Sequence, residues 1–146
     1  MNWYNTHKKN KKKNAAGILF LCSGKILLGL RSQSVSNSGT WAVPGGKVSK
    51  MDANYWETAS RETIEELGFM PNDYSKKSVL KNKNSSGRTF TTFVLEVSED
   101  FIEQSQNDFV KNDEFDEIQW FSLDDLPDNM HRKTLLVINK LRSTHD

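Results

Sequence analysis

Cysteine is almost absent from this chain of 146 residues, since Cys22 is the single one. The chain therefore contains no framework of disulfide bonds, and a reducing, cytoplasmic compartment is the expected location. No apolar run approaches the length of a membrane span, and the first residues lack the apolar core of a secretory signal peptide. We therefore expect no membrane association. A chain of this length can bury a core as one domain without covalent cross-links.

An excess of charge of either sign is also missing, because 20 basic residues face 19 acidic ones and the formal net charge is +1. The charges are unevenly distributed, however. Residues 1–14 hold five lysines and no acid, whereas residues 99–128 hold eleven acids and one lysine. The sequence therefore predicts a basic tail, residues 1–14, on an acidic body. Two interpretations of the tail stay open: a flexible solvated terminus, or a contact for RNA through Lys8–Lys13.

Apolar periodicity divides the chain after its tail into short strands and helices, with no repeat or linker that would split it. Apolar runs at residues 15–21 and 25–31 flank a Ser-Gly pair and predict two strands joined by a tight turn. A helix is expected from about residue 54 to residue 67, where apolar side chains recur at offsets of three and four, and Gly68 suits its end. Further extended segments are expected at residues 41–44, 79–80, 90–97 and 118–122, and a closing amphipathic helix at residues 130–141. We therefore expect residues 15–146 to form a single α/β or α+β domain.

The expected helix at residues 54–67 carries an acidic cluster near its C-terminal end. Glu62, Glu65 and Glu66 are three and four residues apart, which places them on one helical face. Each lies near the negative end of the helix dipole, where a carboxylate costs roughly 0.3–1 kcal/mol, and like charges at this spacing repel. A bound divalent cation would explain the cluster; the alternative is a solvated acidic face. Oxygen ligands without His or Cys nearby favour Mg²⁺, with Mn²⁺ as a substitute.

The loop before this helix contains Gly45-Gly46, which lets the backbone approach a ligand because neither residue has a Cβ. It has neither the lysine of a Walker A loop nor the spacing of a dinucleotide fingerprint. From Gly46 to Phe69 the sequence resembles the Nudix box, G-x5-E-x7-R-E-U-x-E-E-x-G-U, in which U is a bulky aliphatic residue. The match is clearest at residues 61–69, R-E-T-I-E-E-L-G-F. With the flanking G-T-W-A-V-P-G-G and W-F-S-L-D-D-L, the resemblance runs over about residues 15–126.

Two features depart from the family pattern. Asp52 stands where the box has its first Glu, and eight residues instead of seven separate it from Arg61. This start is similar to that of the coenzyme A pyrophosphatase branch, whereas the upstream G-T-W-A-V resembles the branches that act on nucleoside triphosphates and nucleoside-diphosphate sugars. The resemblance thus leaves these substrate classes open. Asp52 is expected to accept a hydrogen bond at the start of the helix.

The resemblance implies a Nudix-type α/β/α sandwich with a mixed central sheet, and hydrolysis by metal-activated water of a nucleoside diphosphate linked to another moiety. The catalytic residues that it implies are Arg61, Glu62, Glu65, Glu66 and Glu114. The implied metal ligands are these four glutamates and a carbonyl of Gly45 or Gly46. Glu114 is assigned by its place six residues before Trp120, with Glu117 as the alternative, and Arg61 would orient the glutamates. Glu57 is expected to be a partner of Arg61 on the helix surface.

On the substrate side, Arg31 is expected to contact a phosphate, and Trp41 and Phe93 to stack on a base. The alternatives are a surface charge for Arg31 and core packing for the two aromatic residues, and Phe90 is assigned to packing. Three functions stay open. They are a Mg²⁺-dependent pyrophosphohydrolase acting on a free nucleotide, ADP-ribose or a nucleotide sugar, a pyrophosphohydrolase of RNA 5′ ends or caps, and a nucleotide-binding module without activity. The sequence is compatible with assembly as a homodimer.

Overall fold

The computed structural model describes residue 3 and residues 14–144, and within them the chain forms seven strands and three helices. The strands are β1 (Ala15–Cys22), β2 (Lys25–Arg31), β3 (Trp41–Ala42), β4 (Gly45–Lys47), β5 (Ser75–Lys83), β6 (Thr89–Glu96) and β7 (Phe115–Ser122). The helices are α1 (Tyr55–Leu67), α2 (Glu99–Asp108) and α3 (Arg132–Thr144). Over these ranges no helix is long and apolar enough to cross a membrane. Lys8–Lys13 fall outside the described residues.

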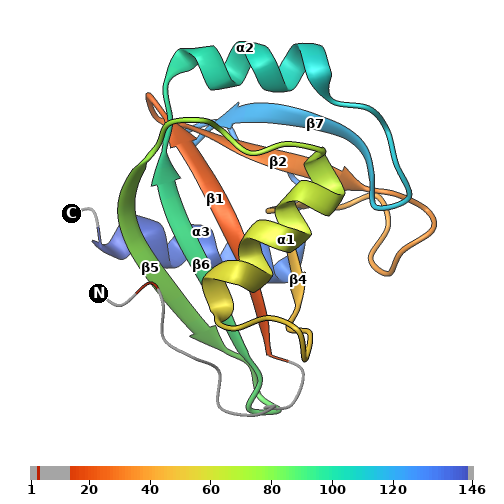
Figure 1. The fold of residues 1–146 in the computed structure, drawn as a ribbon, viewed down its shortest axis with the longest axis vertical. Helices are drawn as coiled ribbons and strands as arrows, with labels where there is room; N and C mark the ends of the chain where they lie inside the picture. Colours follow the sequence, from red (N-terminus) through yellow and green to blue (C-terminus); the bar gives the residue numbers. More distant parts are fainter. Residues whose placement is uncertain (1–2, 4–13, 145–146) are drawn as a thin grey trace.

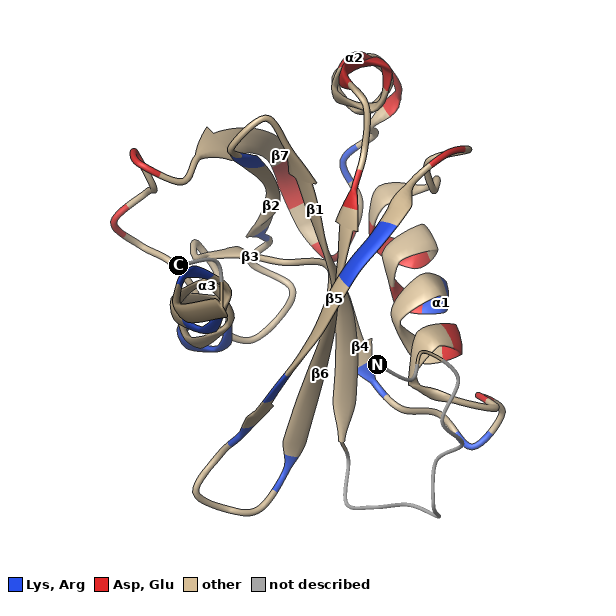
Figure 2. Cartoon of the chain, turned by 90° about the vertical axis from the view of Figure 1, so that its left-hand side faces the viewer, with Lys and Arg blue, Asp and Glu red and all other residues tan. Residues whose placement is uncertain are grey.

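The strands form one mixed sheet in the order β3-β2-β1-β6-β5, with β4 paired to β1 and β7 paired to β2. β1 and β6 run parallel, whereas β1 and β2 are antiparallel neighbours joined by a two-residue turn. α1 lies on one face of the sheet, α3 lies on the opposite face, and α2 lies beside β7 (Figure 1, Figure 2). The expected α+β sandwich with a mixed central sheet is therefore confirmed.

β1 is buried along its whole length because helices cover both faces of the sheet. Its side chains alternate between two hydrophobic clusters, as the pleat of a strand requires. Ile18 and Phe20 belong to the cluster on the α1 side. Leu19 and Leu21 belong to the cluster that contains Ile138 of α3. The centre of the sheet is thus enclosed, whereas its edge strands β5 and β7 are partly exposed.

α1 begins and ends close to the residues that the sequence predicts. Asn54 Oδ1 accepts a hydrogen bond from the Glu57 N–H at 2.8 Å, and Glu57 Oε1 accepts one from the Ala53 N–H at 2.9 Å. Gly68, with a φ of 94°, ends the helix in the left-handed conformation that glycine tolerates. Since this cap engages Glu57, the prediction that Glu57 pairs with Arg61 is wrong. Arg61 does pair with Glu65, four residues further along the helix, and it also pairs with Asp52 and Glu62.

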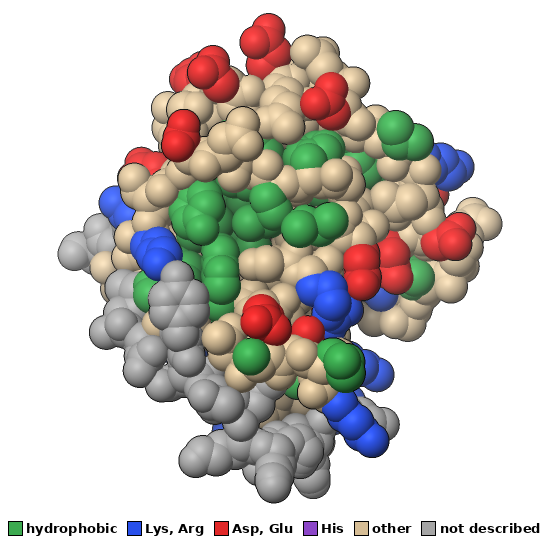
Figure 3. Space-filling model, in the orientation of Figure 1, with side chains coloured by type: hydrophobic (Ala, Val, Ile, Leu, Met, Phe, Trp, Pro, Cys, Tyr) green, Lys and Arg blue, Asp and Glu red, His purple; other side chains and the backbone are tan. Residues whose placement is uncertain are grey.

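α2 is a helix that the sequence analysis did not predict. It lies in the acid-rich segment, where Phe101 and Ser105 are its buried residues. Two buried side chains in ten residues give too weak a periodic signal to be recognised. The Ser105 hydroxyl accepts a hydrogen bond from Trp120 Nε1 at 2.9 Å, which fixes the helix to β7. Acidic side chains gather around α2, above a hydrophobic area on the α1 face of the molecule (Figure 3).

Trp3 is buried in the cluster on the α1 side of the sheet, with 8% of its surface exposed. Its ring centroid lies 5.3 Å from that of Trp56 in α1 and 4.9 Å from that of Phe93 in β6. Lys76 Nζ lies 5.2 Å from the centroid of the same ring. Trp3, which lies upstream of Lys8–Lys13 in the sequence, is therefore anchored to the folded body.

Candidate active site

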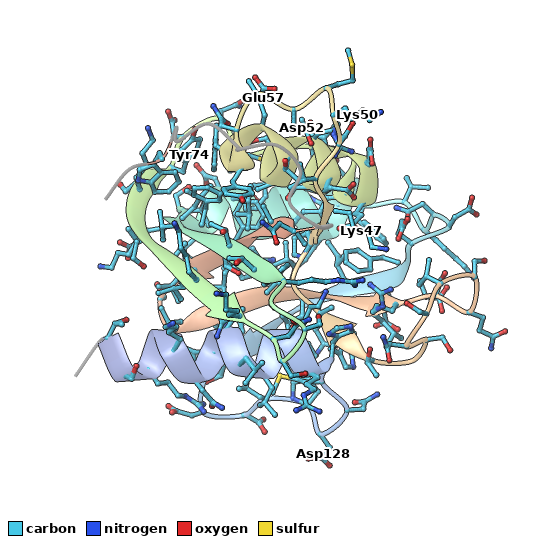
Figure 4. The ribbon with its side chains drawn as sticks, turned by 90° about the horizontal axis from the view of Figure 1, so that it is seen from below. Lys47, Lys50, Asp52, Glu57, Tyr74 and Asp128 are labelled. Atoms are coloured by element: carbon cyan, nitrogen blue, oxygen red, sulfur yellow. The ribbon has the colours of Figure 1, made fainter. Side chains whose placement is uncertain are left out.

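A cleft of about 410 Å³ lies where β4, α1 and the start of α3 meet. The acidic side chains that line it are Glu62, Glu66 and Glu114, and the basic ones are Arg31, Lys47, His131 and Lys133. In the view of Figure 4, Lys47 lies between α1 and α3. The fold thus brings three of the four expected glutamates and Arg31 to one place, from segments up to 83 positions apart in the sequence.

The two glycines of β4 bring the backbone against both β1 and α1. β4 pairs with β1 so that Gly45 lies opposite Gly17. A Cβ on Gly45 would lie 2.6 Å from the Ala16 carbonyl oxygen and from the Gly17 Cα, and one on Gly46 would overlap the Glu62 carboxylate. Packing against the backbone therefore requires Gly45, whereas a side chain at position 46 would displace the Glu62 carboxylate.

The guanidinium of Arg61 connects the loop before α1 to the acidic face of the helix. Its Nε and Nη2 donate to the two carboxylate oxygens of Asp52 at 3.0 and 2.9 Å. Its Nη1 donates to Glu62 at 3.0 Å and to Glu65 at 3.3 Å, and Nη2 also reaches the Lys47 carbonyl at 3.2 Å. This is the arrangement that an orienting role for Arg61 requires.

Asp52 is enclosed under Arg61, with 4% of its side chain exposed. It also accepts hydrogen bonds from the Ser49 N–H at 2.9 Å and the Thr58 hydroxyl at 2.8 Å. Burial alone would raise the pKa of Asp52, but the hydrogen bonds from Arg61, Ser49 and Thr58 outweigh it and lower the pKa to about 2. Figure 4 shows Asp52 at the start of α1, close to Glu57. The expected hydrogen bond at the start of the helix is therefore present.

Glu66 is the most enclosed carboxylate of the cleft, with 3% of the residue exposed. Its Oε1 accepts a hydrogen bond from the Gly45 N–H at 2.8 Å. Burial raises the pKa of Glu66 to about 9 despite this hydrogen bond, and the charges of Glu62 and Glu114 add to the rise. Burial likewise raises the pKa of Glu62, against the effect of Arg61. The cleft thus disfavours the charged form of these two carboxylates, which a bound cation would favour.

Asn112 holds the Glu114 loop against α1. Its Nδ2 donates to the Glu66 carbonyl at 2.7 Å, and its Oδ1 accepts from the N–H groups of Glu114 and Phe115 at 2.9 and 3.0 Å. The alternative residue Glu117 is exposed within β7 and does not line the cleft. The structure therefore favours Glu114 as the acid from this loop, and it adds Asn112, which the sequence analysis did not single out.

The chemistry of this donor set fits a hard divalent cation, because it consists of carboxylates that repel one another beside a backbone without Cβ atoms. Within residues 3 and 14–144, no three His, Cys, Asp or Glu side chains form a ready-made metal cluster. In this structure Arg61 donates a hydrogen bond to Glu62, and the Gly45 N–H donates one to Glu66. Glu65 is 56% exposed, bonded to Arg61, and does not line the cleft. Cation binding would therefore exchange some of these hydrogen bonds for metal contacts.

The aromatic residues expected to stack on a base do not lie in the cleft. Trp41, 9% exposed, packs edge-to-face on Phe121, and Phe93, 1% exposed, packs against Trp3. Both therefore take the alternative role of core packing in this structure. Phe90, which was assigned to packing, is the aromatic residue that lines the cleft. Sequence alone does not separate these cases, because all three aromatic residues lie in or next to apolar strands.

Arg31 lies in the cleft as expected, where its Nε donates to the Ser36 carbonyl at 2.7 Å. Lys47, His131 and Lys133 also line the cleft and were not predicted there. His131 Nδ1 accepts from the Lys133 N–H at 3.1 Å and so caps the start of α3. Burial, together with the charges of Arg31 and Lys133, lowers the pKa of His131. These residues come from three separate segments, and no spacing in the sequence links them.

Comparison with known families gives a match to the NUDIX domain over residues 11–140. Among characterised proteins, the chain is 32% identical over 133 residues to the m7GpppN-mRNA hydrolase of Saccharomyces cerevisiae strain S288c. The match covers 90% of this chain and 13% of that protein. The chain therefore spans about an eighth of the length of this yeast relative.

Solved structures share the fold at lower sequence identity. A Nudix hydrolase from M. smegmatis, RenU, aligns with a TM-score of 0.71 and 23% identity over 91% of this chain and 85% of its own. The C. elegans Ap4A hydrolase in a binary complex aligns with a TM-score of 0.68 and 17% identity over 90% of this chain and 97% of its own. At these identities the likeness establishes the architecture.

Proposed function

The chain belongs to the Nudix family of pyrophosphohydrolases, and we propose that it hydrolyses the pyrophosphate linkage of a nucleoside diphosphate joined to another moiety. The observation that carries this proposal is the cleft itself, where Glu62, Glu66 and Glu114 line one cavity together with the basic side chains of Arg31, Lys47 and Lys133. Carboxylates hold cations, and basic side chains hold phosphate oxygens. Both are needed at one place to break a phosphoanhydride with water. The cytoplasmic location and the homodimer stay predictions.

The residues proposed to hold Mg²⁺, or Mn²⁺ in its place, are Glu62, Glu65, Glu66, Glu114 and the Gly46 carbonyl. The cation would supply an acidified water and charge neutralisation at the phosphates. Arg61 would keep the glutamates oriented through its bonds to Glu62 and Glu65. Arg31, Lys47 and Lys133, which line the same cleft, would bind the phosphate oxygens. The Glu114 carboxylate would accept the proton of the attacking water.

The test of this proposal is a panel of substrates incubated with Mg²⁺ or Mn²⁺: nucleoside triphosphates, ADP-ribose, nucleotide sugars, dinucleoside polyphosphates, coenzyme A and capped RNA. We expect one class to be hydrolysed, with turnover lowered by orders of magnitude in Glu62→Gln and Glu66→Gln. Glu57→Gln is the matched control, because Glu57 lies on the same helix and caps it outside the cleft. Full activity in both cleft variants would contradict the proposal. Background phosphate release across the panel would favour a binding module without activity.

A second candidate is hydrolysis of the 5′ cap of RNA, which the 32% identity to the yeast m7GpppN-mRNA hydrolase favours. The cap joins a nucleoside to the RNA 5′ end through a phosphoanhydride chain, so the same cleft chemistry would apply. Within the panel, capped RNA should then be turned over with a higher kcat/KM than free nucleotides. An equal or lower kcat/KM for capped RNA would favour the hypothesis that the substrate is a free nucleotide.

A further inference from the structure

Basic side chains without acidic partners continue from the cleft toward the β5–β6 hairpin. In the part of the chain that the structure describes, the ion pairs involve none of Arg31, Lys47, Arg88 and Lys133. The ammonium of Lys133 is partly desolvated, and the charges of Arg88, Lys47 and Arg31 lower its pKa further. Lys133 is therefore repelled by the other three cations, and a polyanion bound among them would reduce that repulsion.

A second, smaller hollow adjoins the cleft on this side. Lys133 and Phe90 line both hollows, so they form the boundary between them. Lys133 Nζ lies 5.6 Å from the centroid of the Phe90 ring. Beyond the boundary, Arg88 and Leu136 line the second hollow. The second hollow thus brings an aromatic ring and two cations, Arg88 and Lys133, to one place.

The backbone holds both sides of this boundary in place. On the hairpin, Asn84 Oδ1 accepts from the N–H groups of Ser86 and Arg88, each at 3.0 Å. On the helix, the His131 N–H donates to the Trp41 carbonyl at 2.8 Å, and His131 in turn caps the N–H of Lys133. The backbone that carries Arg88 and Lys133 is therefore ordered before any ligand binds, which lowers the entropy that binding would cost.

We propose that Arg88, Phe90 and Lys133 bind the next nucleotide of a single-stranded oligonucleotide whose 5′ end carries the scissile pyrophosphate in the cleft. The inference rests on the proposed function and names its substrate class. Cations spaced around an aromatic ring match a strand in which phosphates alternate with bases, because bases stack on aromatic rings and lysine or arginine contacts phosphates. A free mononucleotide in the cleft would have no second nucleotide to contact Arg88 in the second hollow.

The test uses the full chain and single-stranded oligoribonucleotides with a 5′-triphosphate, one, two and four nucleotides long, without divalent cations so that binding is measured alone. We expect the dissociation constant to fall several-fold from one nucleotide to two. Arg88→Ala should abolish this gain and reduce the slope of log K against log salt by about 0.7, the value for one lost contact with a single strand. Phe90→Leu should reduce the gain without changing the slope, since stacking carries no charge.

Arg132→Ala is the matched control, because Arg132 is an exposed cation next to Lys133 that lines neither hollow. It should keep the gain with length. A dissociation constant independent of length, or equal effects of Arg88→Ala and Arg132→Ala, would overturn the inference. If the inference is overturned but Mg²⁺-dependent hydrolysis of mononucleotides is observed, the proposed function still stands. Length-dependent binding with no hydrolysis of any substrate would overturn the proposed function and leave only a binding site for an oligonucleotide.

Discussion

Asp52 carries the interaction on which the orientation of the acidic helix face depends. Two of its hydrogen bonds come from the guanidinium of Arg61, one from the Ser49 N–H and one from the Thr58 hydroxyl. The aspartate side chain is one methylene shorter than the glutamate of the family pattern, and one extra residue precedes Arg61. In this structure the carboxylate nevertheless meets Arg61 through both of its oxygens.

We predict that Asp52→Asn destabilises the protein near neutral pH by about 1–2 kcal/mol, after allowance for the exposed part of Arg61. The pKa of Asp52 is lowered in the folded chain from 3.8 to about 2. Its stabilising effect is therefore complete above about pH 4 and is lost as the pH falls through 2. Urea unfolding of both proteins from pH 7 down to pH 3 should show their difference in free energy shrinking below pH 4. A difference that is constant over this range would contradict the assignment.

At the scale of elements, α1 was predictable because its signals are local, whereas the roles of its glutamates rest on the family resemblance and stay predictions. The spacing of Glu62, Glu65 and Glu66 on one face, the cap at Asn54 and the end at Gly68 all follow from neighbouring residues. Glu114 was predictable from its place before the late strand. The cations of the cleft were not, because Lys47 and Lys133 meet only through the pairing of β4 with β1 and the packing of α3.

α2 and the aromatic residues show a second limit of the sequence. α2 buries little apolar surface, so its acidic composition hides it. Trp41, Phe90 and Phe93 have similar neighbours in the sequence, and a shift of one residue along a strand moves a side chain to the other face of the sheet. Whether an aromatic ring packs in the core or lines a cleft depends on that register and on which segments cover the strand.

The burial of Trp3 gives a prediction at the scale of elements. Trp3→Ala should lower the free energy of unfolding by about 2–4 kcal/mol, because it leaves a cavity between Trp56 and Phe93. Trp3→Phe should lose much less, since a second aromatic ring fills most of the same space. The measurement is the urea midpoint of each variant. An unchanged midpoint for Trp3→Ala would show that this contact does not hold the N-terminal segment to the body.

At the scale of the whole molecule, the near-neutral net charge conceals two regions of opposite sign. Acidic side chains lie along α1 and around α2, and basic ones lie on α3 and the lower ends of β5 and β6, with exceptions of each sign on upper β5 and in the loop between β7 and α3 (Figure 2). The cleft lies where the two regions meet. The proposed ligands are of both signs, a cation at the glutamates and phosphates at the basic side chains, so each would relieve a repulsion that the chain alone leaves in place.

This separation predicts that Mg²⁺ stabilises the protein before any substrate is added. At a concentration about 100 times the dissociation constant, binding to the folded state adds about 2.7 kcal/mol, which for a chain of this size raises Tm by roughly 5–10 °C. Thermal unfolding with Mg²⁺, against NaCl of equal ionic strength, measures the shift. Glu66→Gln and Glu62→Gln should each reduce it, because each removes a carboxylate from the cleft.

The rise in Tm caused by Mg²⁺ should be compared between variants. This comparison distinguishes binding of Mg²⁺ in the cleft from general screening of acidic side chains. Glu57→Gln removes one charge from the same helix without changing the cleft, so its shift should equal that of the unchanged chain. If all three variants lose the same part of the shift, the cation acts through net charge and the glutamates of the cleft do not hold it. If only the cleft variants lose it, the acidic region binds the metal independently of the identity of the substrate.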